Sequence, residues 1–344
     1  MVQCPGATAA WLPGHDHRRI KITRGKASRR PFDFLDVFWH SSRVLPLQAP
    51  DSHCLPAADR RFARLLATIL VVILIGLFTG CRTAVPPTPQ GVVKSGQKVK
   101  LTGKEVAVDF YLPQCLKQAP VVVVAHGFSR SRLNMAGWGG LLASNGFIVA
   151  IPDLPAWSDH ERNSQAIREL LDGINSKALV TEPAPSGEGA LMGFSMGGLC
   201  TLLAAATNDQ VRCWVGLDPV DAGRMGAEAA KQLQIPSAVL QAEPGRCNDQ
   251  GNAKQMVAGL PGPLFVLRVQ NGTHTDPEQP TDWLAELVCG KADPNRRAIF
   301  ERYTIAVLKS VFFGDAPSLA TLATATNDAA VTVLSTRAIK GFRP

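Results

Sequence analysis

No feature of this chain constrains its fold more than the run GFSMG at residues 193–197. It lies between an apolar, strand-like run at 189–192 and a helix of small residues at 198–206. A serine flanked by glycines at such a junction is typical of a sharp strand-to-helix turn, because glycine lets the backbone crowd together there. The turn exposes the Oγ of Ser195 and lets the next amide, that of Met196, face a developing oxyanion. We therefore expect a nucleophilic serine at the carboxyl edge of a sheet.

Apolar runs alternate with helical patterns through the rest of the domain. We expect strands at 105–112, 121–125, 147–152, 189–192, 211–217, 237–243 and 264–269, helices at 133–145, 164–174, 281–289 and 295–312, and a Pro-, Ser- and Glu-rich loop at 181–188. Such alternation predicts an α/β fold, with a mainly parallel central sheet covered by helices on both faces. A chain of 344 residues that is 46% hydrophobic can bury the core of one large catalytic domain.

An apolar run, LLATILVVILIGLFT, occupies residues 65–79 and is preceded by three arginines. It ends at Gly80-Cys81, and a basic flank, an apolar run and a small residue before cysteine resemble a bacterial lipoprotein signal. Cleavage there would leave Cys81 as an acylated N-terminus. Phe78 replaces the leucine usual in that signal, so a transmembrane anchor is the alternative. In both cases we expect the catalytic part to lie outside the cytoplasm.

These features divide the chain into five segments. We expect a disordered tail or over-extended start at 1–59, the signal or anchor at 60–81, a linker at 82–99, the catalytic domain at 100–315 and a C-terminal tail at 316–344. Most of the formal net charge of +8 is carried by the first 80 residues. The remainder has little cationic excess, which argues against a nucleic-acid partner.

A nucleophilic serine needs a base, and His274 is the only histidine after Ser195. Chain order in this type of site is serine, acid, histidine, and His274 follows an apolar strand in a glycine-containing turn. His126 begins the run HGF after the buried strand, where the amide of Phe128 is expected to be the second oxyanion donor. We expect the His126 ring to hold that loop by hydrogen bonds, and His160 to be either a solvated bystander or a substrate-side residue.

Three carboxylates could orient His274. Asp218 and Asp221 follow one strand in the run DPVD, and Glu243 ends the next strand. Chain order allows all three, and the residues alone leave the choice open.

The motifs resemble those of a group of α/β-hydrolases that includes chlorophyllases, dienelactone-hydrolase-like esterases and cutinase-type polyester hydrolases. The similar runs are HGF at 126–128, LASNGFIV at 142–149, GFSMGG at 193–198 and DPVD at 218–221. In chlorophyllases the first aspartate of the last run is assigned as the triad acid, which the resemblance carries to Asp218. Polyester hydrolases place an aspartate after the later strand, where this chain has Gly245. The plant chlorophyllase elbow GHSRGG is absent, which argues against chlorophyll as the substrate.

The expected function is hydrolysis of small-molecule or lipid-like carboxylic esters by a Ser195, His274 and Asp218 triad, without cofactor or metal. The alternatives are an acyltransferase with the same triad and a non-catalytic ligand-binding homologue. The sequence does not determine the ester or the oligomeric state. Trp157 and Met196 are candidates for lining an apolar pocket.

The cysteines in the catalytic domain divide by their place in the pattern. We expect Cys200 and Cys213 to be buried thiols, because one falls in the helix after the elbow and the other in an apolar strand. Cys247 and Cys289 follow strand ends on the catalytic side, so in an oxidising compartment we expect them to form a disulfide.

Overall fold

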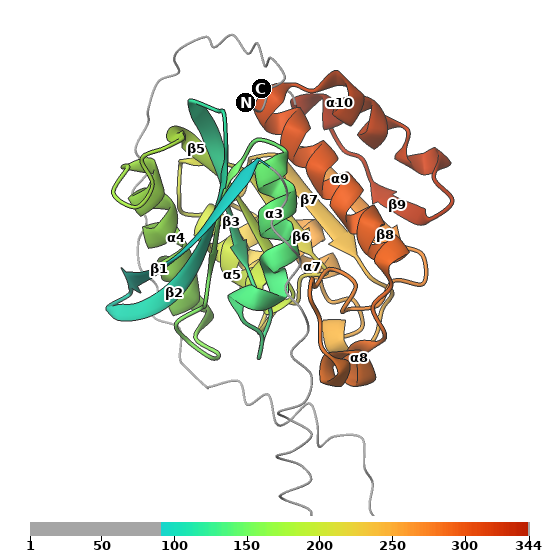
Figure 1. Cartoon of the computed structure of the whole chain (residues 1–344). Helices are drawn as coiled ribbons and strands as arrows, with labels where there is room; N and C mark the ends of the chain where they lie inside the picture. The colour runs from blue at the N-terminus through green and yellow to red at the C-terminus, as the bar shows by residue number, and fades with distance from the viewer. Residues whose placement is uncertain (1–90, 343–344) are drawn as a thin grey trace, which may run out of the picture. The chain divides into compact units, whose positions relative to one another are not determined.

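The computed structural model describes residues 91–342, which form one nine-stranded sheet with helices on both faces (Figure 1). The strands are β1 (Val92–Leu101), β2 (Lys104–Pro113), β3 (Gln118–Ala125), β4 (Ile148–Pro152), β5 (Ala184–Phe194), β6 (Val211–Leu217), β7 (Ser237–Gln241), β8 (Leu264–Val269) and β9 (Val331–Ser335). The α-helices are α3 (Ala136–Ser144), α4 (His160–Asn175), α5 (Met196–Ala205), α6 (Met225–Ala230), α7 (Lys254–Gly259), α8 (Trp283–Cys289), α9 (Pro294–Phe313) and α10 (Ala316–Ala323). Short 3-10 turns include η1 (Arg132–Met135) and η2 (Arg246–Asn248).

The sheet has the order β1-β2-β4-β3-β5-β6-β7-β8-β9. Strands β3 to β8 run parallel, while β1, β2 and β9 pair antiparallel at the two sides. Parallel strands covered on both faces are continuously apolar, as the fully buried β4 illustrates. The carboxyl ends of β3 to β8 therefore open at one edge, where loops can gather functional side chains.

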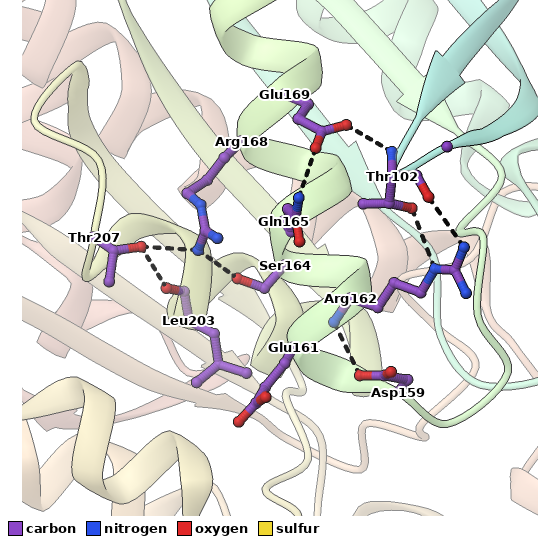
Figure 2. A pocket seen from close by; sticks show the side chains of 11 residues that line it. Thr102, Asp159, Glu161, Arg162, Ser164, Gln165, Arg168, Glu169, Leu203 and Thr207 are labelled. Atoms are coloured by element: carbon purple, nitrogen blue, oxygen red, sulfur yellow. Dashed lines mark hydrogen bonds between the residues drawn. The ribbon is translucent and has the colours of Figure 1, made fainter. Parts of the chain in front are cut away.

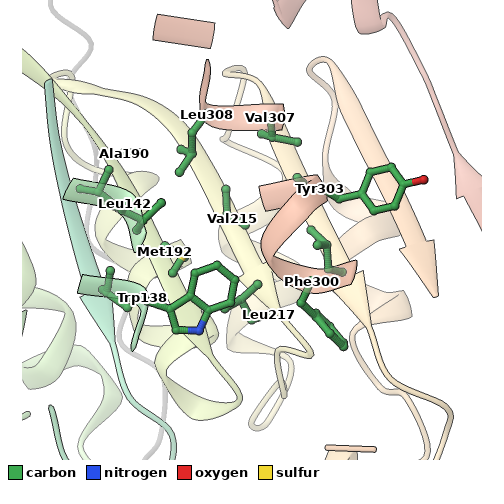
Figure 3. Packing of buried hydrophobic residues seen from close by; sticks show 14 of the residues in the cluster. Trp138, Leu142, Ala190, Met192, Val215, Leu217, Phe300, Tyr303, Val307 and Leu308 are labelled. Carbon is green, nitrogen blue, oxygen red and sulfur yellow. The ribbon is translucent and has the colours of Figure 1, made fainter. Parts of the chain in front are cut away.

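Two apolar clusters fix the helices on the sheet. On one face, Trp138 of α3 and Phe300 of α9 pack with sheet residues such as Leu217 (Figure 3). On the other face, Leu199 of α5 and side chains of α4 and α7 belong to the cluster that contains Trp214 of β6. The predicted α/β fold with a mainly parallel sheet is confirmed.

The folded domain extends beyond the expected boundaries of 100 and 315. Strand β1 begins at Val92, within the predicted linker, because its ten residues pair with all of β2. At the other end, α10 and β9 form within the predicted tail, and Val331 pairs with Val269 of β8. The two added strands, β1 and β9, lie at the edges of the sheet, and their short or half-exposed sequences carry weak periodic signals. Strand β5 also starts at Ala184, inside the predicted loop, because Ala184 pairs with Gln118.

The predicted disulfide between Cys247 and Cys289 is confirmed, with Cα atoms 5.5 Å apart. Cys200 and Cys213 are buried free thiols, as expected. Burial raises the pKa of Cys200 to about 12, so this thiol is unreactive. The apolar run at 65–79 and Cys81 lie outside the described residues. Within 91–342, no helix has the length and apolar character needed to cross a membrane.

Candidate active site

Ser195 occupies a strained turn between β5 and α5. Its backbone angles, φ 53° and ψ −123°, lie in a region that side chains other than glycine rarely adopt. A Cβ on Gly193 would lie 2.1 Å from the carbonyl oxygen of Gly197, and a Cβ on Gly197 would lie 2.4 Å from that of His126. The two glycines are therefore required by close backbone approach. The Ser195 amide donates to the Leu217 carbonyl at 3.1 Å, which fixes the turn on β6.

Ser195, His274 and Asp218 form a continuous hydrogen-bonded chain. His274 Nε2 lies 3.0 Å from Ser195 Oγ, and His274 Nδ1 lies 2.6 Å from Asp218 Oδ2. The three residues come from the loops after β5, β8 and β6, which meet at the carboxyl edge of the sheet. The Asp218 side chain is 2% exposed and that of His274 is 10% exposed. The imidazole can therefore donate Nδ1–H to the carboxylate while Nε2 faces the serine hydroxyl.

The carboxylate of Asp218 is held by donors other than His274. The Ala242 amide donates to Oδ1 at 3.0 Å, and the side-chain amide of Asn248 lies 3.3 Å from Oδ1 and 3.1 Å from Oδ2. Asp218 itself has a positive φ of 41°, so both the serine and the acid sit on strained backbone. These contacts fix the direction in which the carboxylate faces the imidazole.

The other two candidate acids are engaged elsewhere. Asp221 accepts from the amides of Gly226 at 2.7 Å and Ala227 at 3.0 Å, and so caps the start of α6. Glu243 lies 3.8 Å from the Arg268 guanidinium, and both side chains are partly exposed. Of the three candidate acids, Asp218 is therefore the one whose carboxylate contacts His274.

The loop that carries His274 is anchored by a buried ion pair. Asp276, fully buried, accepts from the Thr273 amide at 2.7 Å and pairs with Arg296 of α9 at 2.7 Å. The ring of Phe194 packs against the imidazole of His274 at 4.8 Å between centroids. The imidazole of His274 therefore packs on an aromatic ring, and the loop that carries it is fixed by the ion pair between Asp276 and Arg296.

The expected oxyanion loop runs from His126 to Arg130. His126 lies with Nδ1 2.8 Å from the Gly127 carbonyl, and its Nε2 accepts from the Leu154 amide at 3.0 Å. Both ring nitrogens are thus used by the neutral form, as expected for a structural histidine. Burial lowers the pKa of His126. The Met196 amide opens α5, where amides lack an acceptor within the helix.

A buried salt bridge ties the oxyanion loop to the histidine loop. Arg130 pairs with Glu278 through two hydrogen bonds of 2.6 and 2.8 Å, and with Asp282 at 2.7 Å. Burial raises the pKa of Glu278, although the arginine opposes that shift. The bidentate pair fixes the spacing between the loop that begins at His126 and the loop that follows His274.

Trp157 lies in the loop after β4, and His160 is the first residue of α4. His160 is half-buried, with Nδ1 4.0 Å from the sulfur of Cys200. The ring is therefore not a fully solvated bystander, and a substrate-side role for His160 stays a prediction. Trp157 is 68% exposed and makes an edge contact with Phe128, with ring centroids 4.8 Å apart.

A polar pocket elsewhere in the domain contains none of the predicted site residues. It lies between the β1–β2 turn, α4 and the end of α5 (Figure 2). Its polar groups satisfy one another: Arg162 donates to Thr102, Glu169 accepts from the Thr102 amide, and Arg168 donates to Thr207. We therefore regard this pocket as a structural contact between the β1–β2 turn, α4 and the end of α5. Among residues 91–342, no group of His, Cys, Asp and Glu could hold a metal ion.

The residues that position the site were not predicted from the sequence. Asn248, Asp276 and the Arg130–Glu278 pair reach their partners through contacts that span 20 to 148 residues. No local motif marks such contacts. The one available signal was the position of Asn248 next to Cys247, because a disulfide between catalytic-side loops brings its neighbours to the site.

A parallel sheet with a strained serine turn and a histidine at its carboxyl edge defines an α/β-hydrolase. Residues 97–249 match the model of a family described as PET hydrolase-like. The chain is also 25% identical over 271 residues to the bis(hydroxyethyl) terephthalate hydrolase of Streptomyces coelicolor, covering 70% of this chain and 86% of that protein. The chain is a carboxylic ester hydrolase of the α/β-hydrolase superfamily, and it resembles the cutinase-type polyester hydrolases.

Proposed function

We propose that the protein hydrolyses esters through an acyl-enzyme intermediate on Ser195. The observation that carries the proposal is the hydrogen-bonded chain from Ser195 Oγ through His274 to Asp218. Serine becomes a competent nucleophile only when a neighbouring base takes its proton, and His274 Nε2 is within reach to do so.

The chemistry follows from these positions. As Ser195 Oγ attacks the ester carbonyl, its proton moves to His274 Nε2, and Asp218 stabilises the imidazolium that forms. The amides of Phe128 and Met196 would donate to the oxyanion of the tetrahedral intermediate. His274 then protonates the leaving alcohol, and a water activated by the same ring releases the acid and restores the serine.

For the substrate we propose esters of an aromatic diacid, of the type of bis(hydroxyethyl) terephthalate. The bis(hydroxyethyl) terephthalate hydrolase of Streptomyces coelicolor supports this class, and the aromatic pair formed by Phe128 and the exposed Trp157 offers an apolar edge beside the serine loop. A benzene ring carrying two ester groups could lie against that edge while one carbonyl reaches Ser195.

The substrate class can be tested on residues 82–344 with bis(hydroxyethyl) terephthalate and a series of nitrophenyl esters of increasing acyl length. We expect release of the terephthalate monoester and ethylene glycol, with Ser195→Ala inactive as the matched control. Adding an alcohol acceptor separates the acyltransferase alternative, because a transferase would form the new ester in preference to free acid. Binding of the diester without turnover would instead indicate the non-catalytic homologue.

We further propose that the enzyme works outside the cytoplasm, anchored through a lipid on Cys81. The disulfide Cys247–Cys289 supports an oxidising compartment, and the lipoprotein-like sequence before Cys81 supports the anchor. Expression in a bacterium with labelled palmitate tests the anchor. Cys81→Ser should lose the label and detergent partitioning, whereas unchanged membrane attachment would indicate a transmembrane anchor.

A further inference from the structure

The backbone of Arg130 closes the turn that carries the expected oxyanion donor. Its amide donates to the Gly127 carbonyl at 3.2 Å, which makes a tight turn of the residues between them. These are Phe128, the expected donor, and Ser129, whose positive φ of 56° is unusual for a residue with a side chain. A Cβ on Gly127 would lie 3.2 Å from that of Ser195, so the turn lies directly beside the serine. The shape of this turn therefore determines where the Phe128 amide points.

Glu278 belongs to the loop that carries His274. Its amide donates to the Thr275 carbonyl at 3.0 Å, so its backbone is folded against the residue that follows His274. Its side chain is 1% exposed, and the Thr281 hydroxyl donates to Oε2 at 2.7 Å. A displacement of the Glu278 carboxylate would therefore move the loop on which the imidazole is mounted.

The side chains of Arg130 and Glu278 join these two loops, and we call the pair the loop clamp. Nε and Nη2 of the guanidinium donate to the two carboxylate oxygens, an arrangement that fixes direction as well as distance. The Arg130 side chain is 15% exposed, so water competes little for these bonds. Arg130 thus holds the oxyanion turn with its backbone and the histidine loop with its side chain.

The ring of Phe194 lies between the same two loops. It packs on the His274 ring at 4.8 Å between centroids, and a Cβ on Gly127 would lie 3.0 Å from its Cδ1. The ring prevents the oxyanion turn and the imidazole from moving closer together, and the loop clamp prevents them from moving apart. The distance between the two loops is therefore limited in both directions.

We propose that Arg130 and Glu278 are positioning residues that set the spacing between the Phe128 amide and His274. The proposal rests on the proposed function, in which both groups act on one tetrahedral intermediate. The amide must reach the oxyanion while the imidazole reaches the serine and leaving-group oxygens on the same carbon. A misplacement of about 1 Å can lower the rate by about a hundredfold. Because both groups act most strongly in the transition state, the loop clamp should affect kcat more than KM.

The competing explanation is that the pair only stabilises the fold, and Arg132 provides the matched control. It lies two positions further along the same loop and also bonds two carboxylates, those of Asp109 at 3.0 Å and Asp153 at 2.6 Å. Those carboxylates belong to β2 and to the segment after β4, so Arg132 does not join the oxyanion turn to the histidine loop. A loss of activity specific to Arg130 therefore reports coupling between the loops.

The test measures kcat and KM of the full chain with bis(hydroxyethyl) terephthalate and the affinity for phenylboronic acid. That acid binds Ser195 Oγ as a tetrahedral anion while the serine proton passes to His274, and so it resembles the intermediate. Arg130→Met and Glu278→Gln should each lower kcat by about ten- to a hundredfold, change KM by less than about threefold and weaken phenylboronic acid in proportion to kcat. Arg132→Met should change kcat by less than about threefold.

Two further variants distinguish positioning from general support. The double variant Arg130→Met/Glu278→Gln should be no slower than the slower single variant, because each substitution already breaks the same clamp. Arg130→Lys should retain part of the rate, since lysine keeps the charge without the two parallel hydrogen bonds. Thermal unfolding checks that each variant is folded, and Glu278→Gln and Arg130→Lys carry the test if Arg130→Met does not fold.

Equal losses of kcat in Arg130→Met and Arg132→Met would overturn the proposal. So would losses that multiply in the double variant, or a loss confined to KM. Hydrolysis by the unmodified enzyme reports the proposed function separately. An active parent whose clamp variants are equally active would refute the loop clamp and leave the esterase intact, whereas an inactive parent would refute the proposed function itself.

Discussion

The side-chain amide of Asn248 donates to both carboxylate oxygens of Asp218 and to the Glu243 carbonyl at 2.8 Å. Asn248 is 1% exposed, and its own carbonyl accepts from the amides of Gly245 and Gly251. Its orientation is thus determined by backbone on both sides. We therefore propose that Asn248 positions the carboxylate of Asp218 against His274.

Replacing Asn248 by alanine should lower kcat by about ten- to a hundredfold with little change in KM, because a hydrogen bond to a charged group is lost. The matched control is Asn252→Ala. The side chain of Asn252 bonds the backbone of Asp221 instead of a carboxylate: it accepts from the amide at 2.9 Å and donates to the carbonyl at 3.0 Å. Steady-state kinetics of both variants separate positioning of the acid from support of the loop. Equal losses of kcat in the two variants would contradict the role of Asn248.

The choice of acid has its own test. Asp218→Asn should lower kcat by about three to four orders of magnitude, because the amide no longer stabilises the imidazolium. Asp221→Asn and Glu243→Gln should each cost less than about tenfold, since neither carboxylate touches His274. A severe loss in Glu243→Gln together with a mild one in Asp218→Asn would reverse the assignment.

The disulfide joins two loops that support the site. The double variant Cys247→Ser/Cys289→Ser lacks the bond that closes a loop over 42 positions. In the chain-entropy model its loss should lower the free energy of unfolding by about 4 kcal/mol. For a domain of this size that lowers Tm by roughly 10 °C. Because Asn248 adjoins Cys247 and Thr275 bonds to Gly290, we also expect kcat to fall at temperatures where the variant is folded. Calorimetry and kinetics below Tm measure the two effects separately, and an unchanged Tm would rule out a stabilising role for the bond.

Acid should destabilise the fold through His126. Burial lowers the pKa of this ring in the folded protein, so below about pH 6.5 the unfolded chain binds a proton that the folded chain does not. The neutral His126 ring therefore contributes its full share of the free energy of unfolding above the pKa that the ring has in the unfolded chain. This contribution is lost as the pH falls from there toward the lower pKa of the ring in the folded protein. Protonated Nε2 would also face the Leu154 amide as a second donor. His126→Gln should reduce the slope of Tm between pH 7.5 and 5.5, and a slope equal to that of the unmodified protein would show that His126 is not responsible.

The sequence was sufficient for the parts of the molecule that depend on local patterns. Continuous apolar runs such as residues 121–125 predicted the buried parallel strands, and the glycines around Ser195 predicted the turn at its position. The order of Ser195, Asp218 and His274 along the chain suggested which residues would meet, and the resemblance to chlorophyllases favoured Asp218 over Glu243. Each of these inferences used residues close together in the chain or a known chain order.

The remaining features depend on long-range contacts that leave no local mark. Strand β9 has five residues and alternates between buried and exposed positions, so only its pairing with β8 identifies it as part of the sheet. Arg130 and Glu278 are 148 positions apart, and each resembles an ordinary surface charge until the fold buries the pair. The exposure of α8 was also hidden, because the run at 281–289 predicted a helix but not that none of the residues of α8 would be buried.

The central claim is that Ser195 is the nucleophile of an acyl-enzyme, and a fluorophosphonate probe tests it most directly. Peptide mapping of the labelled protein should find the probe on the peptide that contains Ser195, at one equivalent per chain. Ser195→Ala should lose both the label and ester hydrolysis while remaining folded. Labelling that persists in Ser195→Ala, or ester hydrolysis that survives the substitution, would contradict the account.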